Sequence, residues 1–345
     1  MTRQILVGGV PVGGGAPVTI QSMTNTRTDD VGATVDQILR LEEAGCQIIR
    51  VAVPDMAAAK AVGAIKARIH IPLVVDIHFD YRLALACVEE GCDAVRINPG
   101  NIGGEDRVKA VAEACKAKSL PIRIGVNGGS LEKPLLAKYG GVTPEALVES
   151  AFGHIALLEQ YDFHDICVSL KSSSVVTTMA AYRLISEKSN YPLHLGVTET
   201  GTTRMGTIKS AIGIGGLLAL GIGDTLRVSL SADPVEEVYA AKDILKALGM
   251  AANEPNLVSC PTCGRTRIDL IGLAHQVEER LKSVHKPITV AVMGCVVNGP
   301  GEASAADVGI AGGQGEGLLF RKGEIVKKVP QDQLVDELFA LIDQL

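Results

Sequence analysis

The chain of 345 residues contains no tryptophan, and aromatic residues make up only 3% of it. It has no apolar run long enough to cross a bilayer, because the most suggestive stretch, residues 213–223, is short and rich in glycine. Residues 1–5 also lack the apolar core of a signal peptide. We therefore expect a cytoplasmic protein with no membrane partner.

A basic surface is missing as well. The formal net charge is -6, and no run of lysines and arginines is interleaved with aromatic residues. Proteins that bind nucleic acids in general carry such a surface, so we expect no nucleic-acid partner. Clustered arginines can still form a local anion site inside an acidic protein.

The sequence is rich in glycine, with 38 residues, and it alternates regularly between two patterns. Short β-branched runs are each followed by a polar residue and then by a segment whose apolar residues have helical spacing. The predicted strands are residues 18–23, 48–53, 73–79, 94–98, 122–126, 166–170, 193–197 and 225–230. Strand and helix alternating eight times predict an α/β fold, a (β/α)8 TIM-type barrel over residues 1–249.

A doubly wound open sheet is the alternative to the barrel. We favour the barrel because each unit offers a polar group where its strand ends, as a ring of active-site loops would. Residues 250–345 show a different pattern, in which short strands and cysteine-containing turns are combined with two helices, residues 268–284 and 331–345. This part predicts a smaller α+β domain.

Charged side chains collect at the predicted strand ends. They include four arginines and one lysine, which are Arg50, Arg96, Arg123, Arg227 and Lys171. So many cations at one barrel mouth would repel one another, so we expect an anionic substrate with more than one phosphoryl group. The alternative is that a charged layer inside the barrel pairs with itself, for example Arg50 or Arg96 with Asp76.

Two asparagines belong to the same strand ends. Residues two or four apart on a strand share one face, so Asn98 is expected to point inward with Arg96. Asn127 is expected to point inward with Arg123 for the same reason. Both amides would then lie beside the predicted anion site.

Glu199 follows another predicted strand. Its carboxyl group could donate a proton if burial raised its pKa, or it could pair with Lys171 or Arg227. We favour the catalytic role.

The cysteines fall into two groups. Five of them lie among apolar neighbours and are expected to be reduced packing residues: Cys46, Cys87, Cys92, Cys115 and Cys167. The other three occur in two glycine-containing turns of the second domain.

Cys260 and Cys263 lie in the segment Cys-Pro-Thr-Cys-Gly-Arg, and Cys295 lies in Met-Gly-Cys-Val-Val-Asn-Gly-Pro-Gly-Glu. Three thiols on two turns can converge on one metal centre. No fourth cysteine accompanies them, and Glu302 on the second turn could supply a carboxylate. Structural zinc is the alternative, because a Cys-x-x-Cys turn is as common in zinc modules.

These two cysteine motifs resemble those of the 4-hydroxy-3-methylbut-2-enyl diphosphate synthases, the iron–sulfur enzymes of the non-mevalonate isoprenoid route. The resemblance covers nearly the whole chain. It implies a [4Fe-4S] cluster held by Cys260, Cys263, Cys295 and Glu302. It also implies reductive ring opening and dehydration of 2-C-methyl-D-erythritol 2,4-cyclodiphosphate, with flavodoxin or ferredoxin as electron donor.

The resemblance also assigns roles to the strand-end residues. It places the diphosphate at Arg50, Arg96, Arg123 and Lys171. The matching polar positions are Asp76, Asn98, Asn127 and Glu199, and Asn298 is expected near the reacting carbon. It further implies a head-to-tail homodimer, in which the cluster domain of one subunit caps the barrel of the other.

Two other classes of function stay open at this point. One is a non-redox barrel transferase that acts on a phosphorylated substrate and carries a structural zinc domain. The other is a non-enzymatic iron–sulfur sensor or scaffold. Metal content and turnover of the cyclodiphosphate discriminate among the three.

Overall fold

The computed structural model describes residues 1–98, 100–251, 254–295, 305–313 and 315–345. It divides the chain into two compact units, Met1–Met250 and Ala251–Leu345. No helix in these ranges combines the length and the apolar content needed to cross a bilayer.

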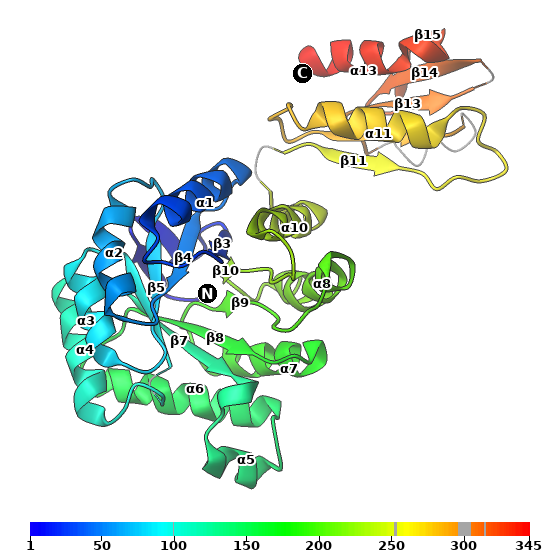
Figure 1. Cartoon of the computed structure of the whole chain (residues 1–345). Coiled ribbons are helices and arrows are strands. Elements are labelled where there is room, and N and C mark those ends of the chain that lie inside the picture. Colours follow the sequence, from blue (N-terminus) through cyan, green and yellow to red (C-terminus); the bar gives the residue numbers. More distant parts are fainter. Residues whose placement is uncertain (99, 252–253, 296–304, 314) are drawn as a thin grey trace. The chain divides into compact units, whose positions relative to one another are not determined.

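The first unit is a closed parallel barrel (Figure 1). Its strands are β3 (Thr19–Met23), β4 (Ile48–Ala52), β5 (Leu73–Asp76), β6 (Ala94–Ile97), β7 (Ile122–Asn127), β8 (Ile166–Lys171), β9 (His194–Leu195) and β10 (Thr225–Leu226). They pair in the order β8-β7-β6-β5-β4-β3-β10-β9, and a parallel bridge between Val168 and Leu193 joins β8 to β9. The predicted barrel is therefore confirmed, and the open sheet is excluded because both edges meet.

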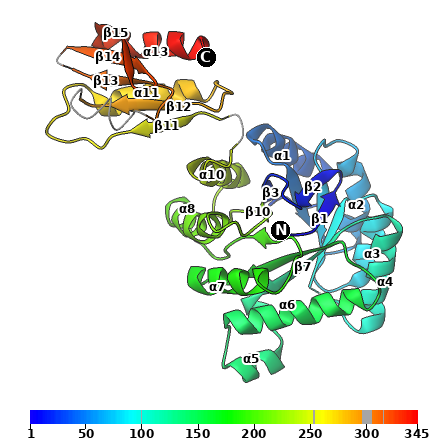
Figure 2. The same ribbon diagram turned by 180° about the vertical axis from the view of Figure 1, so that it is seen from behind.

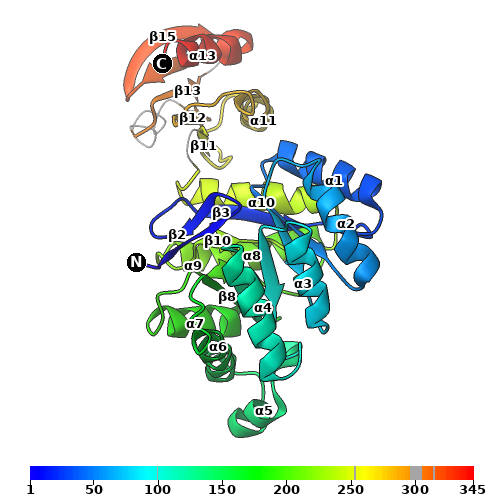
Figure 3. The ribbon, with the colours of Figure 1, turned by 90° about the vertical axis from the view of Figure 1, so that its left-hand side faces the viewer.

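Helices surround the sheet (Figures 1 and 3). The main ones are α1 (Val31–Ala44), α2 (Met56–Lys66), α3 (Tyr81–Glu89), α4 (Glu105–Ala117), α6 (Pro144–Glu159), α7 (Val175–Ser186), α8 (Thr203–Ser210) and α10 (Pro234–Ala247). Local sequence fixes their ends: the Asp30 and Asp55 carboxylates cap α1 and α2, and α1 stops at Gly45 with a φ of 103°. Shorter elements fill the remaining connections: η1 (Gly128–Ser130), α5 (Lys133–Tyr139), η2 (Ala211–Gly215) and α9 (Gly216–Leu218).

The strands are buried on both faces, as in other parallel sheets covered by helices. Side chains alternate along each strand, so Ile49, Val51 and Val95 pack outward in the main hydrophobic core. The same alternation turns Arg50 and Arg96 into the barrel interior. The periodicity of the strands therefore builds a charged layer inside an apolar shell.

A hairpin closes the N-terminal end of the barrel. It consists of β1 (Gln4–Val7) and β2 (Val10–Gly13), joined by Gly8 and Gly9 at positive φ (Figure 2). Its apolar side chains form a buried cluster with the first residues of the strands: Ile5, Val7, Val12, Ile48, Val74, Ala94 and Cys167. The polar loops lie at the opposite end of the barrel, where the strands end.

The second unit has a mixed five-stranded sheet in the order β11-β12-β13-β14-β15. Its elements are β11 (Asn256–Ser259), α11 (Leu270–Leu281), β12 (Thr289–Met293), β13 (Val308–Gly312), β14 (Glu316–Arg321), β15 (Glu324–Pro330), η3 (Gln331–Gln333) and α13 (Leu334–Asp343). β11, β12 and β13 are parallel, and β14 and β15 continue antiparallel. Both helices pack apolar faces into one core with the sheet, which confirms the predicted α+β domain.

Candidate functional site

Asp76 lies between two arginines inside the barrel. Its Oδ1 accepts a hydrogen bond from Arg96 Nη1 at 2.9 Å, and its Oδ2 lies 3.5 Å from Arg50 Nε. Burial by itself raises the pKa of Asp76, but Arg50 and Arg96 outweigh burial and lower it to about 2. The sequence left open that Arg50 or Arg96 pairs with Asp76 inside the barrel, and the structure shows this pairing for both arginines.

Two donors of Arg50 also face a sulfur atom. Its Nε and Nη2 point to the thioether of Met23, at 3.2 and 3.0 Å from Sδ. Sulfur in a thioether is a weak acceptor, so these N–H groups are oriented but poorly satisfied. A phosphoryl oxygen would be a stronger acceptor at the same place.

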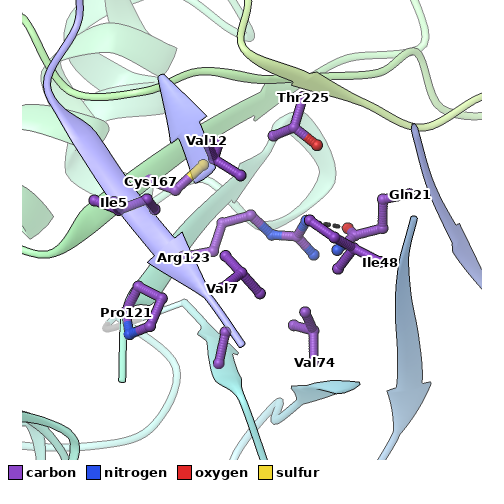
Figure 4. A pocket seen from close by; sticks show the side chains of 11 residues that line it. Ile5, Val7, Val12, Gln21, Ile48, Val74, Pro121, Arg123, Cys167 and Thr225 are labelled. Carbon is purple, nitrogen blue, oxygen red and sulfur yellow. Dashed lines mark hydrogen bonds between the residues drawn. The ribbon is translucent and has the colours of Figure 1, made fainter. Parts of the chain in front are cut away.

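Arg123 lies at the floor of the barrel rather than among the strand-end loops. Its Nη1 donates a hydrogen bond to Gln21 Oε1 across the interior, and Figure 4 shows the side chain beside the hairpin residues Ile5 and Val7. These residues line a cavity of about 30 Å³. Burial lowers the pKa of Arg123 to about 10, so the side chain stays protonated at neutral pH. Its buried Nη2 has no hydrogen-bond partner within the described residues.

Lys171 is another buried cation for which the described residues provide no counter-ion. It is only 6% exposed, and no hydrogen bond or ion pair of its ammonium group is found in the part of the chain that the structure describes. The side chain lies over Gly196, where an added methyl group would be 3.0 Å from Nζ. Burial, and then the neighbouring Arg50 and Arg227, lower the pKa of Lys171 well below its ordinary value.

Two cavities open beside these cations. One, of about 280 Å³, is lined by Arg96, Asn98 and Asn127 together with His78, Phe79, Asn101, Gly129 and Ser130. The other, of about 500 Å³, is lined by Asn127, Lys171 and Glu199 together with Gly128, Gly129, Val142, Ser172, Ser173 and Thr198. Asn127 and Gly129 belong to both, so the two cavities adjoin at the end of β7.

Glu199 is exposed and lines the larger of these two cavities. Its φ of 55° is unusual for a residue other than glycine, and such backbone conformations occur often at functional sites. Arg227, one of its expected partners, is instead bound bidentately by the buried Glu237 at 3.1 and 3.2 Å.

Gly125 makes room for Arg96, whose Nη2 donates to the Gly125 carbonyl at 3.4 Å. A methyl group at Gly125 would lie 2.3 Å from Arg96 Nε. We therefore expect Gly125→Ala to displace the guanidinium from Asp76, to lower the free energy of unfolding by about 1–3 kcal/mol and to weaken binding of an anionic substrate.

Chemical denaturation and a substrate titration measure the two effects. Gly129→Ala is the matched control, because Gly129 lines the cavity that Arg96 also lines and no described atom lies within 4 Å of an added methyl group there. Equal behaviour of the two variants would contradict the role assigned to Gly125.

The cysteine turns of the second unit are joined by backbone contacts. Gly294 N–H, next to Cys295, donates to Cys260 Sγ at 3.1 Å, and Arg267 N–H donates to the Gly294 carbonyl at 3.2 Å. Cys263 is exposed, and Cys260 and Cys295 are half-buried. Three thiols on two linked turns, one already accepting an N–H bond, fit the ligand chemistry of an iron–sulfur cluster.

The predicted ligand set is incomplete in the described residues. Asn298 and Glu302 lie outside them. Among residues 1–98, 100–251, 254–295, 305–313 and 315–345, no three His, Cys, Asp or Glu side chains are grouped closely enough to hold a metal ion. The assignment of Cys260, Cys263, Cys295 and Glu302 as ligands stays a prediction.

The remaining cysteines are packing residues, as predicted. All five are buried and free, and burial raises the pKa of Cys46, Cys87, Cys115 and Cys167 to about 12. Burial shifts the pKa of Cys92 in the same direction. These thiols are therefore protonated and unsuited to bind metal.

Some residues of the interior were not predicted from sequence. Gln21, Met23 and Glu237 each hold one of the arginines, and Gly125 and Gly196 give two cations their space. Inward-facing glycines at strand positions were the available signal, since a glycine inside a strand often marks a close approach. Gln21 and Met23 lie at the end of the predicted strand 18–23, but which arginine each of the three partners binds had no sequence signal, because partner and arginine come from different strands or helices.

Comparisons with known proteins match the whole chain. The model of the GcpE TIM-barrel domain matches residues 2–242, and the model of the GcpE protein C-terminal domain matches residues 256–344. A curated protein of Clostridium perfringens named 4-hydroxy-3-methylbut-2-en-1-yl diphosphate synthase (flavodoxin) is 63% identical over 344 residues, which is 100% of this chain and 99% of that protein. A protein of the same name from Geobacter sulfurreducens is 60% identical, over 100% of this chain and 98% of its own length.

Solved structures agree on the fold of the barrel. The dihydropteroate synthase of Stenotrophomonas maltophilia has a TM-score of 0.51 at 16% identity, covering 71% of this chain and 97% of that one. The spore coat polysaccharide biosynthesis protein spsE of Bacillus subtilis has a TM-score of 0.52 at 10% identity, covering 71% and 73%. At such identities the likeness concerns the architecture alone.

Proposed function

Because this chain belongs to the GcpE family, we propose that it catalyses the reaction for which its relatives are named, the synthesis of 4-hydroxy-3-methylbut-2-en-1-yl diphosphate. The reaction is a step of the non-mevalonate isoprenoid route. One feature of the geometry supports it most directly: four buried cations, Arg50, Arg96, Arg123 and Lys171, lie on strands of one barrel, and among the described residues the carboxylate of Asp76 pairs with only two of them, Arg50 and Arg96. A diphosphate supplies the missing negative charge.

The substrate that we propose is 2-C-methyl-D-erythritol 2,4-cyclodiphosphate. Opening its ring and releasing one water consume two electrons and two protons, and the product keeps both phosphoryl groups as a linear diphosphate. The substrate and the product thus present the same two phosphoryl groups to the protein. Residues that hold the diphosphate can therefore stay in place throughout the reaction.

Arg50, Arg96 and Lys171 are proposed to bind the phosphoryl oxygens. The N–H groups of Arg50 that now point to Met23 Sδ would turn to a stronger acceptor, and the Lys171 ammonium would gain its counter-ion. Arg123 would act through its positive charge and not by direct contact, since it lines the small cavity beside the N-terminal hairpin. Asp76 would keep Arg50 and Arg96 oriented, and Asn98 and Asn127 would donate hydrogen bonds from the cavity wall.

Glu199 is proposed to protonate the departing hydroxyl group. It lines the same cavity as Lys171, so it is available to a substrate bound there. A carboxyl group in reach of the leaving hydroxyl can act as a general acid. Asn298 is proposed to lie near the reacting carbon.

A [4Fe-4S] cluster on Cys260, Cys263, Cys295 and Glu302 is proposed as the redox group. When bound, it supplies electrons one at a time. The N–H bond from Gly294 to Cys260 Sγ is of the kind that orients and tunes thiolate ligands. Flavodoxin is the donor that the relatives' names favour over ferredoxin.

We also propose a head-to-tail homodimer in the cytoplasm. The cation-rich barrel and the cysteine turns belong to different units of the chain, so a second subunit could bring its cluster domain to this barrel. Five buried reduced thiols suit a reducing compartment. Sedimentation analysis tests the oligomeric state.

Anaerobic purification tests the function as a whole. We expect a brown protein with iron and sulfide bound in equal amounts, and turnover of the cyclodiphosphate with a one-electron reductant. A colourless, zinc-loaded protein that is fully active would favour the barrel transferase with a structural zinc domain instead. A brown protein without turnover would favour a sensor or scaffold.

A further inference from the structure

A polar cluster of the buried Ser150 and His154 and the half-buried Glu132 lies beside the loop after β6. Glu132 Oε1 accepts a hydrogen bond from Ser150 Oγ at 3.0 Å and lies 3.0 Å from His154 Nε2. Ser150 Oγ also lies 3.4 Å from His154 Nε2. Glu132 precedes α5, and the other two residues lie one turn apart on α6. The imidazole is 7% exposed, so it is held from both sides inside the protein.

The cluster touches the loop after β6 through Gly100. A methyl group at Gly100 would lie 3.1 Å from His154 Cε1 and 3.5 Å from Glu132 Oε1, so the glycine backbone rests directly on the cluster. Gly100 N–H in turn donates to Asn98 Oδ1 at 3.1 Å. A contact chain therefore runs from Glu132 through His154 and Gly100 to Asn98.

These contacts determine which atoms of the Asn98 amide are available to a ligand. Because Gly100 N–H occupies Oδ1, the two N–H donors of Asn98 are left for the cavity. Phosphoryl and hydroxyl oxygens accept such bonds. A shift of the Gly100 backbone would release Oδ1 and let the amide rotate.

We propose that Glu132 and His154 are positioning residues for the substrate, which act on Asn98 through Gly100. The inference rests on the proposed role of Asn98 in substrate binding. Neither side chain lines the cavity, so both act only through the loop that they support. Ser150 completes the cluster by fixing the Glu132 carboxylate.

Kinetics with a chemical one-electron reductant test the proposal in the cluster-loaded enzyme. We expect Glu132→Ala to raise KM for the cyclodiphosphate about tenfold and to change kcat less than about twofold, because it loosens binding and not the chemistry. Glu132→Gln keeps the acceptor and is expected to stay within about twofold of the wild-type KM. In an Asn98→Ala background, the effect of Glu132→Ala is expected to fall below about twofold, since contacting residues that act in series are not additive.

Glu149→Ala is the matched control. Glu149 lies on α6, the helix of Ser150 and His154, and its carboxylate binds Lys138 and Tyr139. Its substitution is expected to leave KM unchanged. Additive effects of Glu132→Ala and Asn98→Ala, or an equal rise in KM for Glu149→Ala, would overturn the proposal.

Hydrogen exchange separates this inference from the proposed function. The amide of Gly100 is protected by Asn98 Oδ1, so Glu132→Ala is expected to speed its exchange about tenfold without any substrate, and Glu149→Ala is not. Unchanged exchange in Glu132→Ala would refute the contact chain even in a fully active enzyme. Faster exchange in a protein that does not turn over the cyclodiphosphate would support the contacts from Glu132 to Asn98 and would reject the proposed enzymatic function.

Discussion

Serine in place of Cys263 is expected to lower turnover of the cyclodiphosphate by about 10³-fold or more, equivalent to roughly 4 kcal/mol of transition-state stabilisation. Cys263 is exposed on its turn, so the substitution leaves the apolar core of the second unit intact. A hydroxyl group is a far poorer iron ligand than a thiolate, so the cluster should be lost while the domain stays folded. Iron and sulfide content, visible absorption and anaerobic turnover measure the loss.

The control for this substitution is Cys115→Ala, which removes a buried packing thiol. We expect that variant to keep its iron and its activity and to lose at most about 1–2 kcal/mol of stability from the small cavity. Full activity of Cys263→Ser with bound zinc would reject the iron–sulfur assignment. Loss of activity with all iron retained would give Cys263 a role other than ligation.

Methionine in place of Lys171 is expected to change function and stability in opposite directions. KM for the cyclodiphosphate should rise about 100-fold, because the substitution removes a desolvated charge that would face a phosphoryl group. The free energy of unfolding should rise by roughly 1–3 kcal/mol, because a buried amino group with no partner among the described residues is replaced by an apolar chain of similar length. Steady-state kinetics and thermal unfolding measure the two effects.

Ligand-dependent unfolding sharpens this test. The cyclodiphosphate should raise the unfolding temperature of the wild-type protein and should stabilise Lys171→Met much less, because a ligand stabilises only the state that binds it. Lys60→Met is the control, since Lys60 is exposed on α2. A variant with normal KM, or one that is less stable than the wild type, would show that Lys171 has a partner in the working enzyme other than the substrate.

The architecture was predictable from sequence because it depends on local pattern. Runs such as Ile48–Ala52 and Ile122–Asn127 have β-branched residues and the apolar spacing of strands buried on both faces, and Asp30 and Gly45 mark the two ends of a helix. The alternation along the strands also predicted that Arg96 and Arg123 point inward. No contact between distant residues was needed for these conclusions.

The partners of the charged groups were not predictable in the same way. Asp76 binds two arginines at once, and Arg123 reaches across the barrel to Gln21, 102 residues away. Arg227 binds Glu237 rather than Glu199. Which acceptor each cation takes depends on distances between strands, and these distances exist only once the sheet has closed.

The sequence by itself determined the eight strands and their helices, the inward face of each strand, and the two cysteine turns that identify the family. Only the tertiary structure decided that one carboxylate serves two guanidinium groups, that Gly125 and Gly196 make the space for Arg96 and Lys171, and that Glu132 and His154 support the loop of Asn98. The physical reason is that periodicity is a property of neighbouring residues, whereas the energy of a buried charge is set by side chains that come from other strands and helices.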